Sequence, residues 1–185
     1  MPMLLGLTGP AGCGKDSVAN HLQREHAFTP TSFAAPLKNA CQYLFGLSHD
    51  EVTDRELKEK TIPFWGLSPR QIMQRFGTEA MKVTFGDEFW VKSWLRTYQK
   101  FGTTDHVVVS DVRFEEEAAQ IRAMGGRIVH ITRNNNPLAL DGDAAKHASE
   151  MGVARLEGDL VIGNNGALND LYIAADTVAR IAMGV

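Results

Sequence analysis

A glycine-rich stretch directly after a short apolar run constrains this chain more than any other feature. Residues 6–17 read GLTGPAGCGKDS, and Gly9, Gly14 and Lys15 have the spacing of a loop whose backbone N–H groups wrap around phosphate. The apolar run 3–8 predicts a buried strand before the loop, and the residues after it predict a helix whose N-terminus adds positive potential. The stretch therefore predicts a phosphate-binding strand–loop–helix unit. The simpler alternative is an ordinary glycine-rich turn.

The residue after Lys15 departs from the common form of this loop. A Ser or Thr hydroxyl that ligates Mg²⁺ usually stands there, but this chain has Asp16, followed by Ser17. A carboxylate facing a polyphosphate is repelled unless a cation or donor lies between them. We therefore expect Asp16 to hold Mg²⁺, directly or through water, or to face the second substrate; otherwise it only complements the helix N-terminus. The predicted phosphate contacts are Gly9, Ala11, Gly12, Cys13, Gly14, Lys15, Asp16 and Ser17.

Apolar runs alternate with helical patterns along most of the chain. The runs 3–8, 106–112, 127–133 and 159–165 predict buried strands, and 28–34 predicts a weaker one. Such alternation is typical of a parallel sheet covered by helices, here a three-layer α/β fold in a single domain of residues 1–185. The inner faces of the first and last helices are predicted to contain Val18, Ala19, Leu22, Leu168, Leu171, Ala175, Val178 and Ile181.

Two segments interrupt this alternation. Residues 47–100 predict a helical insertion, in which Ser48 and Ser68 begin capping boxes because Glu or Gln follows each three residues later. Residues 134–152 are polar and rich in turn formers, which inside a compact domain indicates a functional loop. We expect the first segment to bind the molecule that accepts a phosphoryl group, called the acceptor below, and the second to form a lid.

Composition narrows the class of protein. The 185 residues carry a formal net charge of −3, which argues against a broad electrostatic surface for nucleic acid. No apolar run approaches the roughly 18 residues of a membrane span, and the first residues lack the basic region of a signal peptide. The two cysteines, Cys13 and Cys41, make no disulfide framework. We expect a cytoplasmic protein without a nucleic-acid or membrane partner, and a Cys13 thiol whose alkylation inhibits unless ATP protects it.

Polar residues follow the second long apolar run. Asp111 ends it, and Arg113 projects to the same side of an extended chain two residues later. Ligands of open α/β sheets bind at the carboxyl ends of the strands, so both residues are candidates for the metal or acceptor. The alternative is a structural ion pair. Glu115–Glu117 look like the solvated first turn of a helix; the alternative for Glu117 is that it reaches back toward Arg113.

Further candidates lie in the two interrupting segments. Arg70 and Gln74 share a helix face in the insertion, where they fit a phosphate and a base edge, although a plain surface pair fits equally well. Lys38 and Trp90 are additional acceptor candidates, with a solvated lysine and a core tryptophan as alternatives. The candidates for the lid and the donor base are Arg133, Lys146, His147, Asn164 and Asn165.

Seven stretches in order, GPAGCGKDS, FAAPLK, SPRQIMQRFGTE, SDVRFEEEA, HITR, HASE and DLVIGNNG, resemble the bacteriophage-type deoxynucleoside monophosphate kinases. In that family Lys-Asp followed by Ser or Thr is the usual end of the loop, so Asp16 is a family trait. Residues 48–62 match no part of the pattern. The resemblance implies a nucleoside-monophosphate-kinase fold of the P-loop class, ATP as donor, Mg²⁺, and a deoxynucleoside monophosphate as acceptor.

The resemblance also implies roles for single residues. It places the donor phosphates on residues 9–17 and gives acceptor roles to Lys38, Arg70, Asp111 and Arg113 and a lid role to Arg133. Together with the residue patterns above, we expect Lys15, Asp16, Arg113 and Arg133 to act in catalysis and Asp16 and Asp111 to hold Mg²⁺. We expect Gln74 and Trp90 to join the acceptor site. Two alternatives stay open: another small-molecule P-loop kinase, similar to phosphomevalonate or dephospho-coenzyme A kinase, and a nucleotide-binding switch without catalysis. A homodimer is a further expectation.

Overall fold

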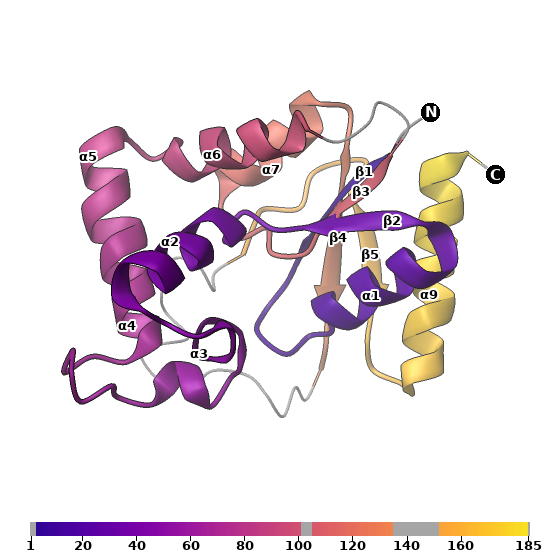
Figure 1. The fold of residues 1–185 in the computed structure, drawn as a ribbon. Helices are drawn as coiled ribbons and strands as arrows, with labels where there is room; N and C mark the ends of the chain where they lie inside the picture. The colour runs from indigo at the N-terminus through magenta and orange to yellow at the C-terminus, as the bar shows by residue number, and fades with distance from the viewer. Residues whose placement is uncertain (1–2, 101–104, 135–151, 185) are drawn as a thin grey trace. The chain divides into compact units, whose positions relative to one another are not determined.

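A computed structural model describes residues 3–100, 105–134 and 152–184 (Figure 1). The chain forms two compact units. Unit 1 consists of Met1–Ser32 with Lys100–Val185, and unit 2 of Phe33–Gln99. Among the described residues, no helix combines the length and the apolar character needed to cross a bilayer.

Unit 1 is built on a five-stranded parallel sheet of order β2-β3-β1-β4-β5. The strands are β1 (Leu4–Thr8), β2 (Phe28–Thr31), β3 (His106–Val109), β4 (Arg127–Thr132) and β5 (Leu160–Gly163). All five predicted strands are confirmed, and each begins within one residue of the predicted start. Because β1 lies in the centre, the loop that follows it leaves the middle of the sheet's carboxyl edge.

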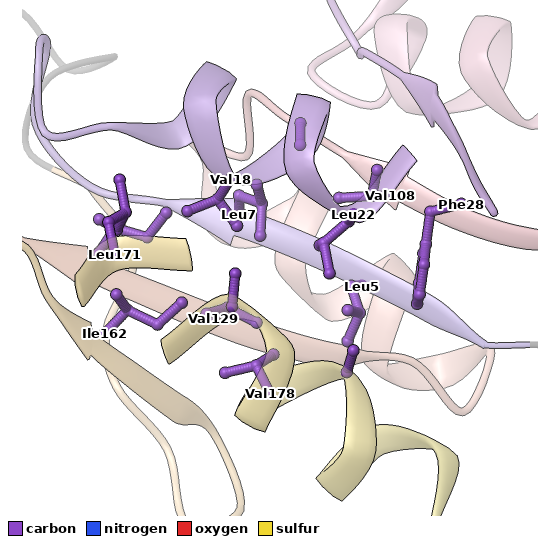
Figure 2. Close-up of a cluster of buried hydrophobic side chains, with 14 of the residues drawn as sticks. Leu5, Leu7, Val18, Leu22, Phe28, Val108, Val129, Ile162, Leu171 and Val178 are labelled. Carbon is purple, nitrogen blue, oxygen red and sulfur yellow. The ribbon is translucent and has the colours of Figure 1, made fainter. Parts of the chain in front are cut away.

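Helices cover both faces of this sheet, so the predicted three layers are confirmed. Helices α1 (Lys15–His26) and α9 (Leu168–Met183) pack on the face to which Leu5 and Leu7 point (Figure 2). Helix α7 (Glu115–Ala123) packs on the other face, where a Cβ on Gly6 would lie 2.6 Å from Cδ1 of Ile121. The buried cluster of Figure 2 includes Leu5, Leu7, Val18, Leu22, Phe28, Val108, Val129, Ile162, Leu171 and Val178.

The inner face of α9 differs in part from the prediction. Leu171, Ala175 and Val178 are buried as expected, but Leu168 and Ile181 are 56% and 47% exposed. Ala179 is buried in place of Ile181, because at 100° per residue position 179 lies about 40° from Ala175 and position 181 about 120° away. Leu168 opens the helix, one turn before the first buried position.

Unit 2 is helical. Its elements are α2 (Ala35–Phe45), α3 (His49–Thr53), the 3₁₀ turn η1 (Leu57–Glu59), α4 (Pro69–Gln74), the π-helical segment η2 (Arg75–Lys82), α5 (Val83–Phe85) and α6 (Phe89–Tyr98). Both predicted capping boxes are present: Ser48 Oγ accepts from the Glu51 N–H at 3.1 Å, and Ser68 Oγ from the Gln71 N–H at 3.3 Å. These caps fix where α3 and α4 begin.

A glycine lets two helical segments of unit 2 approach closely. A Cβ on Gly77, within η2, would lie 2.9 Å from Cδ2 of Leu37 on α2. The Gly77 carbonyl accepts the indole N–H of Trp90 at 2.9 Å. Trp90 is thereby held inside unit 2 by both packing and its single hydrogen-bond donor.

Candidate active site

The loop between β1 and α1 has a backbone path that requires glycine. Gly9, Gly12 and Gly14 have φ values of 144°, 74° and 111°, which residues with a side chain rarely adopt. At Gly9 a Cβ would also lie only 2.2 Å from the carbonyl oxygen of Ile131 on β4. The loop is therefore pressed against the neighbouring strand, and its shape depends on the sheet.

Lys15 lies across this loop. Its Nζ donates to the carbonyl oxygens of Gly9 at 2.7 Å and Pro10 at 2.9 Å. Helix α1 begins at Lys15 without a side-chain cap at Gly14, and the first N–H groups of a helix have no partner within it. An ammonium group and a helix N-terminus thus meet at one loop, an arrangement that suits a phosphate group.

The acidic candidates offer oxygen donors only. Asp16 is exposed in the first turn of α1, with the half-buried Ser17 hydroxyl beside it in sequence. Asp111 is half-buried just beyond β3, the strand that pairs with β1. Carboxylate and hydroxyl oxygens are the ligands that Mg²⁺ prefers, so the donor set fits this metal.

The turn after β3 is supported from within. The Val112 N–H donates to the Leu7 carbonyl at 3.0 Å, which ties the turn to β1. Glu117 Oε2 accepts the backbone N–H groups of Arg113 at 2.8 Å and Phe114 at 3.1 Å. These bonds hold the stretch that presents Asp111 and Arg113.

Glu117 itself corrects the prediction of a solvated turn at 115–117, since it is only 5% exposed. It is buried because its carboxyl folds back under the preceding turn to reach those N–H groups. Burial, and secondarily the nearby Asp111 carboxylate, raise the pKa of Glu117 to about 8. The alternative that Glu117 reaches back toward Arg113 is confirmed, with the Arg113 backbone N–H as the partner, and Glu three residues after Phe114 has capping-box spacing.

The ends of β4 and β5 reach the same loop. Arg133 Nη1 donates to the Gly12 carbonyl at 3.3 Å, and Asn164 Nδ2 donates to the Cys13 carbonyl at 2.8 Å. Asn165 Oδ1 accepts the Asn134 N–H at 2.7 Å. The structure therefore brings Arg133 and Asn164 onto the glycine loop, while Asn165 joins the chain segments that leave β4 and β5.

Two candidates lie outside the described residues. They are Lys146 and His147, which belong to the predicted lid 134–152, itself described only at residues 134 and 152.

The remaining acceptor candidates all belong to unit 2. Lys38 is half-buried on α2, and Gln74 is half-buried at the end of α4. On α4, Arg70 Nε donates to Glu59 Oε1 at 2.5 Å, so its guanidinium already has an anionic partner. Trp90 is 8% exposed, and its packing accounts for it as a core residue.

Cys13 is fully buried within the loop. Burial raises the pKa of its thiol, and the Lys15 ammonium only partly opposes this effect. A buried thiol with a raised pKa reacts slowly, which contradicts the basis for expecting ready alkylation.

Comparison with known proteins identifies relatives in viruses. The family model described as deoxynucleotide monophosphate kinase matches residues 59–174. A protein of Acanthamoeba polyphaga mimivirus, provisionally named deoxynucleotide monophosphate kinase, is 33% identical over 92% of both chains. The deoxynucleotide monophosphate kinases of Escherichia phage RB69 and Enterobacteria phage T4 are 34% and 36% identical over 61% and 57% of this chain. The matched regions span 45% and 42% of those phage proteins, less than half of each.

Solved structures show the same fold at low sequence identity. A dephospho-CoA kinase from Campylobacter jejuni has a TM-score of 0.56 at 17% identity, with 100% of this chain and 99% of that one covered. A sugar kinase from Janibacter sp. HTCC2649 has a TM-score of 0.50 at 12% identity, with 100% and 96% covered. At such identities the likeness concerns the fold alone.

The family model covers more than half of this chain, and the mimivirus relative covers nearly all of it. The earlier resemblance is thus confirmed, and the chain belongs to the deoxynucleotide monophosphate kinase family.

Proposed function

We propose that this protein transfers the γ-phosphoryl group of ATP to the phosphate of a deoxynucleoside 5′-monophosphate, giving ADP and the deoxynucleoside diphosphate. One observation carries the proposal. In a chain of this family, the glycine loop with Lys15 lies at the same carboxyl edge of a parallel sheet as Asp111, Arg133 and Asn164. Open α/β sheets bind their ligands at this edge.

The donor phosphates bind in the glycine loop. Backbone N–H groups of Gly9, of residues 11–14 and of the first turn of α1 donate to phosphate oxygens, whereas Pro10 has no N–H to donate. Lys15 Nζ, now on the carbonyls of Gly9 and Pro10, turns to the phosphates and contributes its charge. Arg133 stands next to Gly12 and adds a second cation, which stabilises the charge that develops on the transferred group.

Asp16 and Asp111 would hold the magnesium ion. Bound Mg²⁺ supplies neutralisation of the negative charge on the phosphates. Asp16 approaches from the first turn of α1, and Asp111 from the end of the strand beside β1. Their carboxylates thereby also lose the repulsion that they would otherwise exert on the polyphosphate.

The acceptor needs orientation more than activation. A phosphate monoester has a second pKa near 6, so its oxygen is mostly deprotonated at neutral pH and requires no general base. That oxygen attacks the γ-phosphorus in line, and the bond from the γ-phosphorus to the bridging oxygen breaks as ADP leaves. We assign orientation of the acceptor to Arg113 with Lys38, Arg70 and Gln74, and no contact to Trp90. Arg70 exchanges Glu59 for the acceptor phosphate.

A coupled assay of ADP release tests the proposal. Mg-ATP is mixed with dAMP, dGMP, dCMP, dTMP or dUMP, with AMP, phosphomevalonate and dephospho-coenzyme A as controls. We expect turnover with some of the five deoxynucleotides. Lys15→Met is expected to lower kcat by at least about 100-fold, as loss of a group that stabilises the transition state does. Lys92→Met is the matched control, because Lys92 is exposed on α6 in a pair with Glu88.

Other outcomes discriminate between the alternatives. Turnover with only phosphomevalonate or dephospho-coenzyme A would favour a different small-molecule kinase. ATP binding without acceptor-stimulated ADP release would favour a switch module, and either result contradicts the proposal.

We also propose the partners and the cellular location of the protein. Small nucleotides are its partners, and the cytoplasm is its location, that of a bacterial host if a phage encodes the chain. A homodimer stays a prediction, which light scattering coupled to size-exclusion chromatography tests.

A further inference from the structure

A cluster of three side chains lies on unit 1 at the end of α1 remote from the glycine loop. Nε2 of His21 and Nε2 of His26, both on α1, lie 2.6 Å and 2.8 Å from the same oxygen, Oδ1 of Asp176 on α9. One ligand atom from each residue lies within 4.8 Å of those of the other two. Within residues 3–100, 105–134 and 152–184, this is the one such group of three or more His, Cys, Asp or Glu side chains.

The cluster is rigid on one side and open on the other. The side chain of His21 is 9% exposed, and its ring stacks on Tyr172 of α9, with centroids 4.4 Å apart and planes 7° apart. The guanidinium carbon of Arg24 lies 5.8 Å from the other partner of this stack, the Tyr172 ring. The side chains of His26 and Asp176 are 17% and 29% exposed, so solvent reaches them. An ion can therefore enter a site in which one ligand is already fixed.

Hydrogen bonding to Asp176 uses only one nitrogen of His21. Both imidazoles must present an N–H to one carboxylate oxygen. Nδ1 of His21 is then buried without a hydrogen-bond partner among the described residues. The phosphoryl transfer proposed above uses none of the three residues. Along the axis of α1, His21 lies roughly 9 Å and His26 roughly 16 Å from Lys15.

We propose that His21, His26 and Asp176 form a binding site for a divalent transition-metal ion, with zinc as the expected occupant, that joins α1 to α9. Two imidazole nitrogens and one carboxylate oxygen are a common protein donor set for Zn²⁺, with water in the fourth position. Mg²⁺ prefers oxygen ligands, so the magnesium that the reaction uses does not compete for this site.

The affinity follows from the surroundings of His21. Coordination through Nε2 places the imidazole proton on Nδ1, where ligating histidines usually donate to a carbonyl, carboxylate or water. Nδ1 of His21 has no such acceptor among the described residues, and loss of one typically weakens metal binding by 10- to 100-fold. With three protein ligands in place of four, we expect a dissociation constant of about 1 µM, weaker than in structural zinc sites.

Zinc titration of the full chain against a chromophoric chelator, with Mg²⁺ in excess, tests the site. We expect one zinc ion per chain. His26→Ala and Asp176→Asn are each expected to weaken binding by at least about 100-fold, since loss of a ligand exceeds loss of a supporting bond. His49→Ala is the matched control, because His49 is exposed on α3. Zinc at 100 times its dissociation constant is expected to raise the Tm by about 5–10 °C in the wild type and the control only.

Cobalt gives a readout that does not depend on the variants. Co²⁺ bound to two imidazoles and a carboxylate has a visible absorption band, which wild-type protein should show at one equivalent and which one equivalent of zinc should abolish. Zinc binding that is equal in wild type, His26→Ala and Asp176→Asn would overturn the proposal. Absence of the cobalt band would overturn it as well, even if Asp176→Asn failed to fold.

Discussion

Replacing Glu117 by glutamine changes one ionisation at the candidate active site and preserves its hydrogen bonds. A single oxygen, Oε2, accepts the N–H groups of both Arg113 and Phe114. A glutamine oxygen can accept the same two bonds, and its NH₂ group replaces the proton of a neutral carboxyl. Glu117→Gln therefore mimics the protonated form of Glu117 at every pH.

The size of the effect follows from the pKa of Glu117, which is raised from 4.5 to about 8. Between these values the unfolded chain releases the proton while the folded chain retains it. The free energy of unfolding therefore falls as the pH rises through this window, by about 1.4 kcal/mol per pH unit. From pH 5 to pH 7 the wild type is expected to lose about 2.5 kcal/mol relative to Glu117→Gln.

Urea unfolding followed by far-UV circular dichroism at pH 5, 6 and 7 measures this difference. Glu25→Gln is the control, since Glu25 is an exposed carboxyl on α1. The wild type and the control are expected to lose stability relative to Glu117→Gln in parallel as the pH rises. A constant difference between wild type and Glu117→Gln across the range would refute a raised pKa. If Glu117→Gln were less stable than the wild type at pH 5, the argument that glutamine keeps both hydrogen bonds would be refuted.

Three further changes probe the surroundings of the site. Gly9→Ala places a Cβ 2.2 Å from a β4 carbonyl oxygen, so we expect the free energy of unfolding to fall by about 3 kcal/mol. We also expect at least tenfold weaker ATP binding, measured by calorimetry. The control Gly46→Ala, whose Cβ meets no atom within 4 Å, is expected to lose only about 1 kcal/mol. Iodoacetamide is expected to modify the buried Cys13 only as fast as the protein opens; rapid labelling of folded protein, followed by mass spectrometry, would contradict this. Asp159→Asn breaks a 2.7 Å pair with Arg122 and is expected to cost about 2 kcal/mol at pH 7. Burial opposes ionisation of Asp159, but hydrogen bonds led by that from Arg122 lower its pKa overall. The stabilisation that the wild type gains from this carboxylate is therefore lost as the pH falls below 3.8. Equal Tm values of wild type and Asp159→Asn at pH 7 would contradict this.

Local signals in the sequence were sufficient for the strands, the glycine loop and the helix starts. Each depends on neighbours within a few residues: a run of apolar side chains, a glycine spacing, or a Ser followed by Glu or Gln three positions later. The parallel sheet then follows from alternation, and parallel strands place Asp111, Arg133 and Asn164 at one edge. For this reason three candidates that are spread over more than 50 residues of sequence could be expected at one edge of the sheet.

What the sequence could not supply depends on contacts between distant segments. Glu117 stands in a run of three acids, of which Glu115 is exposed and Glu116 half-buried, and the fold of the preceding turn determines that Glu117 is the buried one. Trp90 is explained by the carbonyl of Gly77 in a π-helical segment, which no local pattern predicted. The pairing of His21 with Asp176 spans 155 residues, so the spacing of the two histidines on α1 gave no sign of a third ligand.

The order of the strands has a consequence for how the chain folds. The central strand β1 pairs with β3, about 100 residues later, and with β4, later still. Closing a loop of that length costs about 4 kcal/mol of chain entropy before any pairing rewards it, whereas unit 2 is one continuous segment. During synthesis, unit 2 is therefore complete in sequence while β1 still lacks both neighbours. Because Gly9 lies against the β4 carbonyl of Ile131, the phosphate loop acquires its shape only after that strand has joined the sheet. Nucleotide binding during synthesis therefore indicates a chain that extends beyond the end of β4 at Thr132.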